Sequence, residues 1–391
     1  MRLTDISSTQ RHALQLTFVE SFVTILIERG VYFYTCHTLG FSDRDNLLLA
    51  LAFGLVYAAT AVVSHWCTKW WGERNLLWLT LFSQLVVTLA MAALPSAGVV
   101  VAGTILLGGL YGLKWPVLES YMLAGDTPSR AVSTVGRFSM SWSIAIPLAL
   151  AAAGPLIGAG RIWLFLAAVA AGLPSFFVVW HLPPRPLHLP HDHPEHLPPP
   201  TAARWRRLLV ASRVLMFTGY AQLWVLAALL PGIYVHLSLP VSFAAGLSGM
   251  VDLMRFAAFT LFGIWIGWHD RRWPVAAVLI GQPLGFALVC LGGSLAWVLL
   301  GELIFGLSLG LTYYAALYYA MTLKRGAVEA GGGHEGLVGL GFAVGPGLVL
   351  LGKTLGFAGN LPGMAVLVTV CSAWAWGAVR TLNNKVCVQS P

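Results

Sequence analysis

Long apolar stretches of about 20 residues follow one another along almost the whole chain, and each is long enough to cross a membrane as a helix. Membrane β-strands would be about 10 residues long and would alternate polar and apolar positions. The observed pattern therefore predicts an all-α membrane protein with twelve transmembrane helices. They are expected at 13–37, 45–66, 76–94, 97–124, 131–158, 161–181, 207–236, 241–267, 274–292, 295–322, 334–356 and 361–380.

One polar stretch interrupts this pattern, between the sixth and seventh predicted helices. Residues 183–206 are rich in proline, which breaks helices, so we expect a non-helical cytoplasmic linker there. The linker divides the chain into two six-helix halves, residues 1–182 and 207–391. It also holds four histidines, for which a solvated linker is favoured over loose metal binding: His188, His191, His193 and His196.

The two halves repeat a short motif at corresponding places. Gly154-Pro155 lies near the end of the fifth predicted helix, and Gly345-Pro346 lies in the eleventh. Proline bends membrane helices, and we expect both motifs to support movement of the halves rather than to contact a ligand. Two pseudo-symmetric repeats with a site at their interface are an architecture of transporters.

Composition excludes a water-soluble protein. Hydrophobic residues make up 58% of the 391 residues and charged residues 10%, whereas soluble domains carry about 25% charged residues. The five cysteines are scattered, and the sequence shows no zinc-type spacing, phosphate-binding loop, HExxH motif or Ser/His/Asp arrangement. We therefore expect no enzyme activity, no cofactor and no bound metal.

The net charge of +8 indicates membrane topology rather than a nucleic-acid partner. Most Lys and Arg lie in loops and tails on one side of the membrane, whereas the opposite loops carry Arg44, Arg161 and Lys353. Because the positive side faces the cytoplasm, both termini are expected there, in a monomer of the plasma or inner membrane. The expected partners are the lipid bilayer, a small-molecule solute and protons.

These features resemble the major facilitator superfamily over the full length of the chain. The resemblance rests on the Gly-Pro motif and its echo, the long central loop and the basic short loops. The superfamily's loop signature after the second and eighth helices, Gly-x-x-x-Asp-Arg-x-Gly-Arg-Arg, is partly present. Its remaining residues are Lys69, Gly72 and Arg74 in the first copy and Asp270, Arg271 and Arg272 in the second. The resemblance implies a transporter whose halves rock around a central site.

Three predicted helices also resemble the proton-coupled oligopeptide transporters locally. The first-helix motif of those proteins, Glu-x-x-Glu-Arg-Phe-x-Tyr-Tyr, is similar to residues 25–34, in which Glu28 and Arg29 match and the first Glu is absent. Their Lys-Pro element in the fourth helix is similar to residues 114–116, and their Gly-Glu pair in the tenth helix is similar to residues 301–302. The resemblance implies proton coupling through acidic side chains.

Ionisable residues inside the predicted helices are the main candidates for function. A charged side chain at the bilayer centre costs about 2.5–3.5 kcal/mol on insertion scales, so it needs a partner or a water-filled cavity. Six acids and five bases nearly balance, which favours paired charges around a polar cavity. They are Glu20, Glu28, Arg29, Lys114, Glu119, Arg137, Arg213, Asp252, Arg255, Glu302 and Glu335.

Glu28 and Arg29 point about 100° apart on a helix, so each can meet a different partner. Tyr32 follows one turn after Glu28 on the same face. We interpret Glu28 as a proton-coupling residue and Arg29 and Tyr32 as substrate-binding residues, with an ion-pair network between helices as the alternative. Lys114 is a candidate to hold a substrate carboxylate, or a carboxylate on another helix.

Other candidates follow from spacing and context. Asp252 and Arg255 are three residues apart with the acid first, which predicts a structural ion pair. Arg137 is a candidate substrate contact or gate. Tyr314 and Tyr318 share a helix face, which suits an amphipathic ligand or, for Tyr318, an interfacial aromatic belt. Further proton-coupling candidates are Glu119, Glu302, His334 and Glu335.

Together these residues predict a secondary active transporter that moves a small solute by alternating access and is coupled to protons. Proton-driven efflux of lipophilic compounds is an alternative that rests on the Trp and Tyr content. A membrane sensor on the same scaffold, without net transport, is a second alternative.

Overall fold

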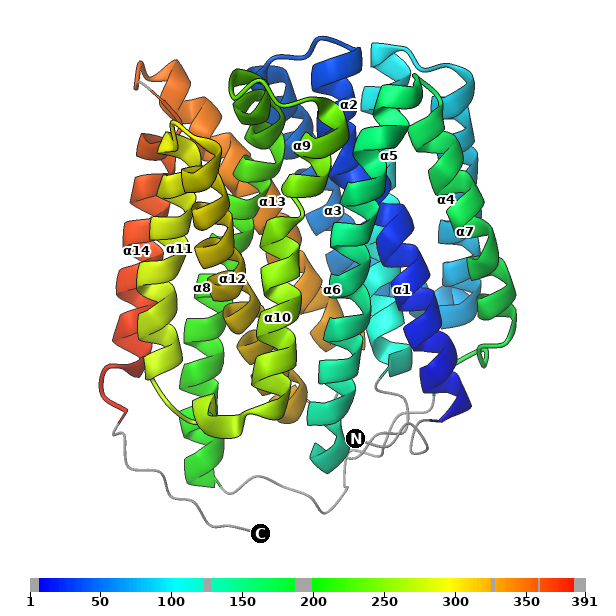
Figure 1. Cartoon of the computed structure of the whole chain (residues 1–391). Coiled ribbons are helices and arrows are strands. Elements are labelled where there is room, and N and C mark those ends of the chain that lie inside the picture. The colour runs from blue at the N-terminus through cyan, green and yellow to red at the C-terminus, as the bar shows by residue number, and fades with distance from the viewer. Residues whose placement is uncertain (1–6, 123–127, 187–198, 325–327, 358, 383–391) are drawn as a thin grey trace.

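The computed structural model describes residues 7–122, 128–186, 199–324, 328–357 and 359–382, and within these ranges the chain forms helices and no strand. Most of the helices run roughly along one common direction (Figure 1). Their bounds are α1 Ser8–Glu28, α2 Gly30–Thr38, α3 Asp43–Trp71, α4 Glu73–Ala93, α5 Ala97–Met122, α6 Pro128–Ala159, α7 Trp163–Trp180, α8 Pro199–His236, α9 Val241–Leu247, α10 Met250–Ile264, the short 3₁₀ helix η2 Ile266–Trp268, α11 Trp273–Leu291, α12 Leu295–Lys324, α13 Val328–Thr354 and α14 Leu361–Val379.

The predicted membrane spans correspond to these helices. Among the described residues, eleven segments are long and apolar enough to cross a membrane. The predicted first span, 13–37, is the pair α1 and α2, which is interrupted at Arg29. The predicted eighth span is the pair α9 and α10, interrupted at Ser248 and Gly249. The all-α fold class with twelve spanning units is confirmed.

The helix after the central linker begins earlier than expected. α8 begins at Pro199, so the prediction of a non-helical segment is wrong for residues 199–206. Proline is tolerated in the first turn of a helix because its missing N–H would have no partner there. The following residues are good helix formers, which extends α8 upstream of the predicted boundary at 207. The four linker histidines lie outside the described residues.

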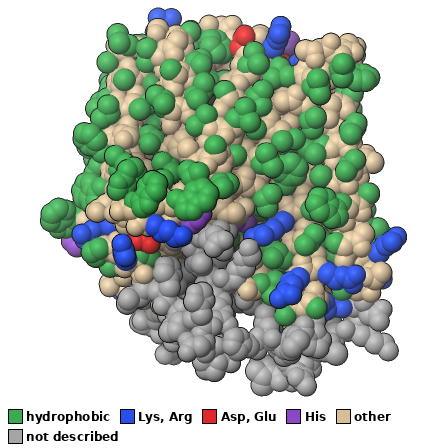
Figure 2. Space-filling model, turned by 180° about the vertical axis from the view of Figure 1, so that it is seen from behind, with side chains coloured by type: hydrophobic (Ala, Val, Ile, Leu, Met, Phe, Trp, Pro, Cys, Tyr) green, Lys and Arg blue, Asp and Glu red, His purple; other side chains and the backbone are tan. Residues whose placement is uncertain are grey.

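The outer surface of the molecule is largely apolar. Figure 2 shows hydrophobic side chains spread over the helices, with Lys and Arg side chains gathered mainly towards one end of the molecule. Large exposed side chains such as Leu55, Phe82, Ile280 and Trp374 belong to this surface. An apolar exterior of this extent is stable against lipid and not against water.

We name α1–α7 the N-terminal half and α8–α14 the C-terminal half, and the two lie side by side in Figure 1. The halves pack against each other mainly through α3 on α13 and through α6 on α9 and α10. Both Gly-Pro motifs lie inside continuous helices, α6 and α13. A Cβ added at Gly154 would meet the Val241 backbone of α9, whereas one added at Gly345 would meet the Ala221 backbone of α8. The first motif thus lies between the halves, and the second lies within one half.

Candidate functional site

A buried carboxylate joins the two halves beside the interruption between α1 and α2. Arg29 Nη1 donates to Asp252 Oδ2 at 3.1 Å, and Arg255 Nη1 donates to Asp252 Oδ1 at 2.7 Å. All three side chains are buried. The structure thus contains the expected pair of Asp252 and Arg255 and adds Arg29, which was expected to bind substrate. Two guanidinium groups on one carboxylate supply the additional hydrogen bonds that a buried ion pair needs.

Aromatic rings surround the Arg255 guanidinium group. Arg255 Nη2 donates to the Tyr220 hydroxyl at 2.7 Å. The guanidinium carbon lies 4.6 Å from the ring centroid of Trp142, 5.4 Å from that of Tyr220 and 5.9 Å from that of Tyr313. Contacts between a cation and aromatic faces stabilise a charge that is removed from water. Because Trp142 belongs to α6, Arg255 also contacts the N-terminal half.

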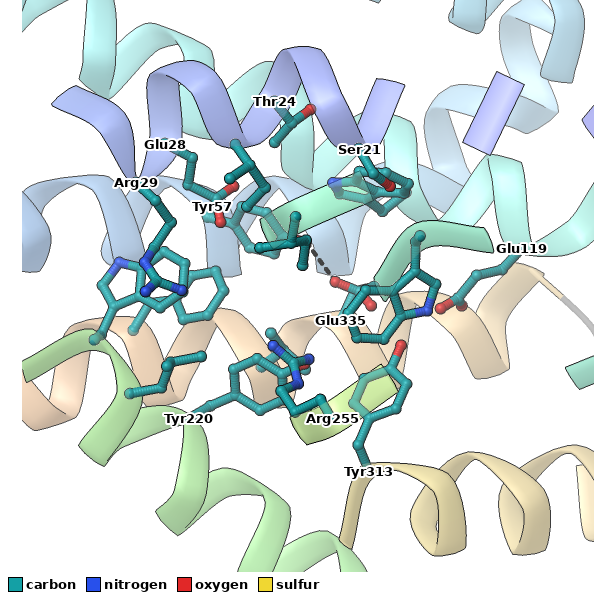
Figure 3. A pocket seen from close by; sticks show the side chains of 18 of the residues that line it. Ser21, Thr24, Glu28, Arg29, Tyr57, Glu119, Tyr220, Arg255, Tyr313 and Glu335 are labelled. Carbon is teal, nitrogen blue, oxygen red and sulfur yellow. Dashed lines mark hydrogen bonds between the residues drawn. The ribbon is translucent and has the colours of Figure 1, made fainter. Parts of the chain in front are cut away.

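A central cavity lies between the halves, with about 650 Å³ of empty space that includes its opening (Figure 3). The wall comes from α1, α3, α5 and α6 of one half and from α8, α10, α12 and α13 of the other. Its charged residues are Glu28, Arg29, Glu119, Arg255 and Glu335. Its aromatic residues are Tyr57, Trp115, Phe138, Trp142, Tyr220, Trp224, Tyr313 and Phe342.

Glu28, the last residue of α1, lies on the cavity wall. Glu28 is buried, with 7% of the residue exposed. Among the described residues, no side chain or backbone group forms a hydrogen bond or ion pair with its carboxylate. The neighbouring Arg29 Nη2 also has no hydrogen-bond partner in the described part of the chain. Glu28 is therefore a carboxylate available to a ligand or a proton.

A second polar group lies where α5 meets α13. The carboxyl groups of Glu119 and Glu335 and the ring of His334 each place one atom within 4.8 Å of the others, and all three residues are buried. The Tyr57 hydroxyl on α3 donates to Glu335. Two ionised carboxylates this close repel each other, so the arrangement requires a proton or another cation. By residue type, this set could also hold a divalent metal ion.

Lys114 belongs to a polar network inside the N-terminal half, which reaches the cavity wall at Thr24. Its Nζ donates to Glu20 at 2.6 Å and to Thr24 and Gln84 at 3.0 Å each. Ser175 donates to Glu20 at 2.5 Å. Lys114 is fully buried and is not among the residues that line the cavity. Of its two expected roles, the structure gives it pairing with a carboxylate on another helix.

Glu302 lies within the C-terminal half. The Tyr234 hydroxyl of α8 donates to Glu302 Oε1 at 3.0 Å, and within the described chain Glu302 Oε2 has no hydrogen-bond partner. Glu302 is fully buried and does not line the cavity. It is a buried carboxyl group with spare acceptor capacity outside the cavity lining.

The remaining sequence candidates lie outside the cavity lining. Tyr32 and Tyr314 are buried, and Arg137 is half-buried on α6. Tyr318 packs against Trp205, Trp268 and the ring of His269. The structure therefore brings Glu28, Arg29, Glu119 and Glu335 together at the cavity and leaves these four candidates away from it.

Most of the aromatic cavity wall was not predicted. No pattern in the sequence distinguishes Trp142, Tyr220, Trp224 or Phe342, because aromatic residues occur throughout the apolar stretches. Tyr57 offered a weak signal, since it is a hydrogen-bonding side chain in an otherwise apolar run. Which aromatic residues face the cavity depends on how the helices are rotated, and periodicity within one helix does not determine that rotation.

Acidic groups outnumber basic groups in the buried interior. Arg137 and Arg213 are only half-buried, so the near-balance expected from the sequence does not hold for the interior. Among the described residues, six carboxyl groups and three Lys or Arg side chains are buried. The buried carboxyl groups belong to Glu20, Glu28, Glu119, Asp252, Glu302 and Glu335, and the buried cations are Arg29, Lys114 and Arg255.

Comparison with known proteins identifies the fold. No protein-family model matches the sequence, and no curated protein is significantly similar to it. The crystal structure of a point mutant of the nucleoside transporter NupG matches this chain with a TM-score of 0.67 at 11% identity, covering 96% of this chain and 100% of that one. The human organic anion transporter MFSD10 (TETRAN) matches with a TM-score of 0.61 at 16% identity, covering 96% and 99%.

Both neighbours are transporters of the major facilitator type, which are not enzymes. The match extends over nearly the whole chain, so the protein has the major facilitator fold, as its sequence resemblance implied.

Proposed function

We propose that the protein is a secondary active transporter that moves a small solute across a membrane by alternating access. One observation carries this proposal: a central cavity is walled by both halves and contains buried ionisable groups. The contacts at the cavity between Arg29 and Asp252, and between Glu119 and Glu335, cross from one half to the other. Rocking of the halves would break and re-form such contacts.

Protons are the coupling ion in this proposal, and Glu119 and Glu335 form their site. The two carboxyl groups come from different halves and lie near each other in a buried setting. A shared proton removes their repulsion and holds α5 against α13 on this side of the cavity. When the halves separate there, water reaches the pair and the proton can leave. Glu28, Glu302 and His334 are further proton-binding candidates beside this pair.

The first experiment is a search for the solute. A solute that binds the folded protein raises its apparent melting temperature, so purified protein can be screened against classes of compounds. The two structural neighbours indicate nucleosides and organic anions as classes to include, and the local sequence resemblance adds short peptides. A solute found in this way then enters transport assays.

Counterflow in proteoliposomes tests transport, and a pH gradient tests coupling. We expect counterflow of the solute, and uphill accumulation only when a pH gradient is imposed. Glu335→Gln should abolish the response to the gradient and retain counterflow, whereas Glu73→Gln, outside the cavity, should behave like the wild type.

Binding without counterflow would identify a sensor instead. Accumulation that ignores the pH gradient, or that is lost on adding a chelator, would refute proton coupling.

The proposed topology places both termini in the cytoplasm of a cell whose plasma or inner membrane holds the protein as a monomer. It is supported by the basic side chains gathered towards one end of the molecule (Figure 2) and by a cavity that one chain completes. A fluorescent C-terminal fusion should therefore be protected from external protease. Cleavage of that fusion on intact cells would contradict the topology.

A further inference from the structure

The buried charges of the interior do not cancel. Lys114 pairs with Glu20, and Arg29 and Arg255 both pair with Asp252. All three buried Lys and Arg side chains are therefore paired with only two of the six buried carboxylates. The carboxyl groups left over belong to Glu28, Glu119, Glu302 and Glu335. A proton shared between Glu119 and Glu335 neutralises part of this excess. The interior still has an excess of acidic groups, and a buried ionised carboxylate that accepts no hydrogen bond is stabilised by a nearby cation.

Three of these four carboxyl groups line the cavity, those of Glu28, Glu119 and Glu335, and Glu28 is the one outside the close pair of Glu119 and Glu335. It lines the cavity and has no hydrogen-bond or ion-pair partner among the described residues. The two cationic side chains of the wall, Arg29 and Arg255, each donate to Asp252, and Arg29 Nη2 is left without a hydrogen-bond partner among the described residues. An anionic solute would nevertheless add to the acidic excess of the interior.

Aromatic rings form much of the remaining wall. Trp224 and Phe342 stack with ring centroids 3.4 Å apart, and the Phe53 ring lies beside this pair, 6.0 Å from Trp224 and 6.2 Å from Phe342. Tyr57 and Phe342 meet edge to face. Aromatic faces attract cations through the negative charge of the π-system, most strongly where water is excluded. The same rings bind a flat apolar body by burying its surface.

We propose that the solute is an organic cation, with its positive charge carried on an aromatic body and Glu28 as its counter-ion. This inference deepens the proposed function and rests on it for the step of transport. The carboxylate holds the charged group, and the rings of Trp142, Trp224 and Phe342 hold the body. A cation that enters as protons leave keeps the charge of the interior nearly constant, which suits exchange of the solute for protons.

Binding of two ions that differ mainly in the sign of their charge tests the proposal on the unaltered protein. Tetraphenylphosphonium and tetraphenylborate have the same shape, and uridine serves as a neutral aromatic solute. We expect purified wild-type protein to bind tetraphenylphosphonium, measured by calorimetry, at least about tenfold more tightly than either of the others. Tighter binding of tetraphenylborate or of uridine would overturn the proposal.

Variants then locate the site. Glu28→Gln should weaken binding of tetraphenylphosphonium about tenfold or more, since a charged contact is lost. Glu28→Asp, which keeps the carboxylate, should retain most of the affinity, and Glu73→Gln should bind like the wild type. Wild-type affinity in a folded Glu28→Gln variant would overturn the assignment of the counter-ion.

The outcome is separable from that of the transporter proposal. Selective binding of the phosphonium ion without counterflow would refute transport and leave the cation site standing. Counterflow of an anion or a nucleoside, without binding of the phosphonium ion, would support transport and refute the cation site.

Discussion

Single buried charges in this protein differ in how completely they are paired. Glu20 accepts hydrogen bonds from Lys114 and Ser175, and Asp252 accepts from two arginines. Glu28 accepts none from the described residues. A fully paired buried charge stabilises the packing of the helices that carry the pair. Removal of one partner leaves the other charge buried without compensation, which destabilises the fold. Pairing therefore separates residues that stabilise the fold from residues that are free to act on a solute.

The Lys114–Glu20 pair provides a test of this distinction. Lys114→Met leaves Glu20 without its cation, and we expect a loss of about 3–5 kcal/mol in the free energy of unfolding, seen as a lower melting temperature. The double variant with Glu20→Gln has no stranded charge and should recover much of the loss. A double variant at least as unstable as Lys114→Met would show that the two residues are not coupled.

His269 lies outside the membrane-spanning helices and gives the fold a dependence on pH. Its ring stacks on Tyr318 with centroids 4.7 Å apart, and burial lowers its pKa to about 4. In the unfolded chain a histidine has a pKa of about 6.5, so below that pH the unfolded state binds the proton more readily than the folded state does. The stability associated with neutral, buried His269 is therefore fully present above about pH 6.5 and is lost as the pH falls towards about 4.

Melting temperatures at two pH values measure this contribution. Between about pH 7 and about pH 5, the wild type should lose more stability than His269→Gln does. The reason is that only the wild type has an imidazole that takes up a proton on unfolding and resists protonation when folded. Arg204 and Asp270, which pair nearby, are unchanged in both proteins. An equal loss in the two proteins would show that His269 does not contribute.

Residue identity predicted the charged candidates better than their partners. The scarcity of charge in apolar stretches pointed to Glu28, Arg29, Glu119 and Glu335, and the structure places all four at one cavity. Lys114 was equally conspicuous in the sequence but lies within one half. Whether such a residue faces a neighbouring helix or a cavity depends on helix rotation and packing, and a single sequence records neither.

Among the helices, the repeated Gly-Pro motif illustrates how one local sequence acquires two structural settings. Gly154 lets α6 approach α9 of the other half, and Gly345 lets α13 approach α8 of its own half. Helix positions could be predicted because lipid requires long apolar helices. The interruption at Arg29 and the early start of α8 could not, because tertiary contacts set local helix boundaries.

Valine at the two glycines should therefore have different effects. Gly345→Val overpacks α13 against α8, and we expect a lower melting temperature, with a cost of about 1–3 kcal/mol. Gly154→Val should instead push α6 from α9 and shift the population of conformations, with a smaller loss of stability. Spin labels on Leu148→Cys of α6 and Phe243→Cys of α9 measure that separation. Equal destabilisation without a change in distance would contradict this view.

At the scale of the whole molecule, the halves are held together by packing as well as by the chain. α3 packs along α13, α6 packs on α9 and α10, and Asp252 binds Arg29 across the interface. If the chain between residues 187 and 198 serves only as a tether, then the assembled state does not depend on its continuity.

Cleavage of the linker tests this arrangement. A protease site inserted within residues 187–198 should be cut without dissociation, so the two fragments should elute together from a sizing column and keep the melting temperature of the uncut protein. The same site placed in the α3–α4 connection, around Gly72, should destabilise the protein on cutting because it divides one half. Separation of the fragments after linker cleavage would contradict a packed interface.

The sharing of Asp252 by two arginines has a consequence for genetics. Asp252→Asn removes the negative charge between the two guanidinium groups and leaves one acceptor oxygen where both now donate. The resulting surplus of positive charge is correctable at a distance, by removal of one of the two cations. A selection for brighter colonies carrying a fluorescent fusion, which reports folded yield, should recover second-site suppressors that neutralise Arg29 or Arg255. These suppressors would map to either half of the coding sequence. Recovery of true revertants at codon 252 alone would contradict that prediction.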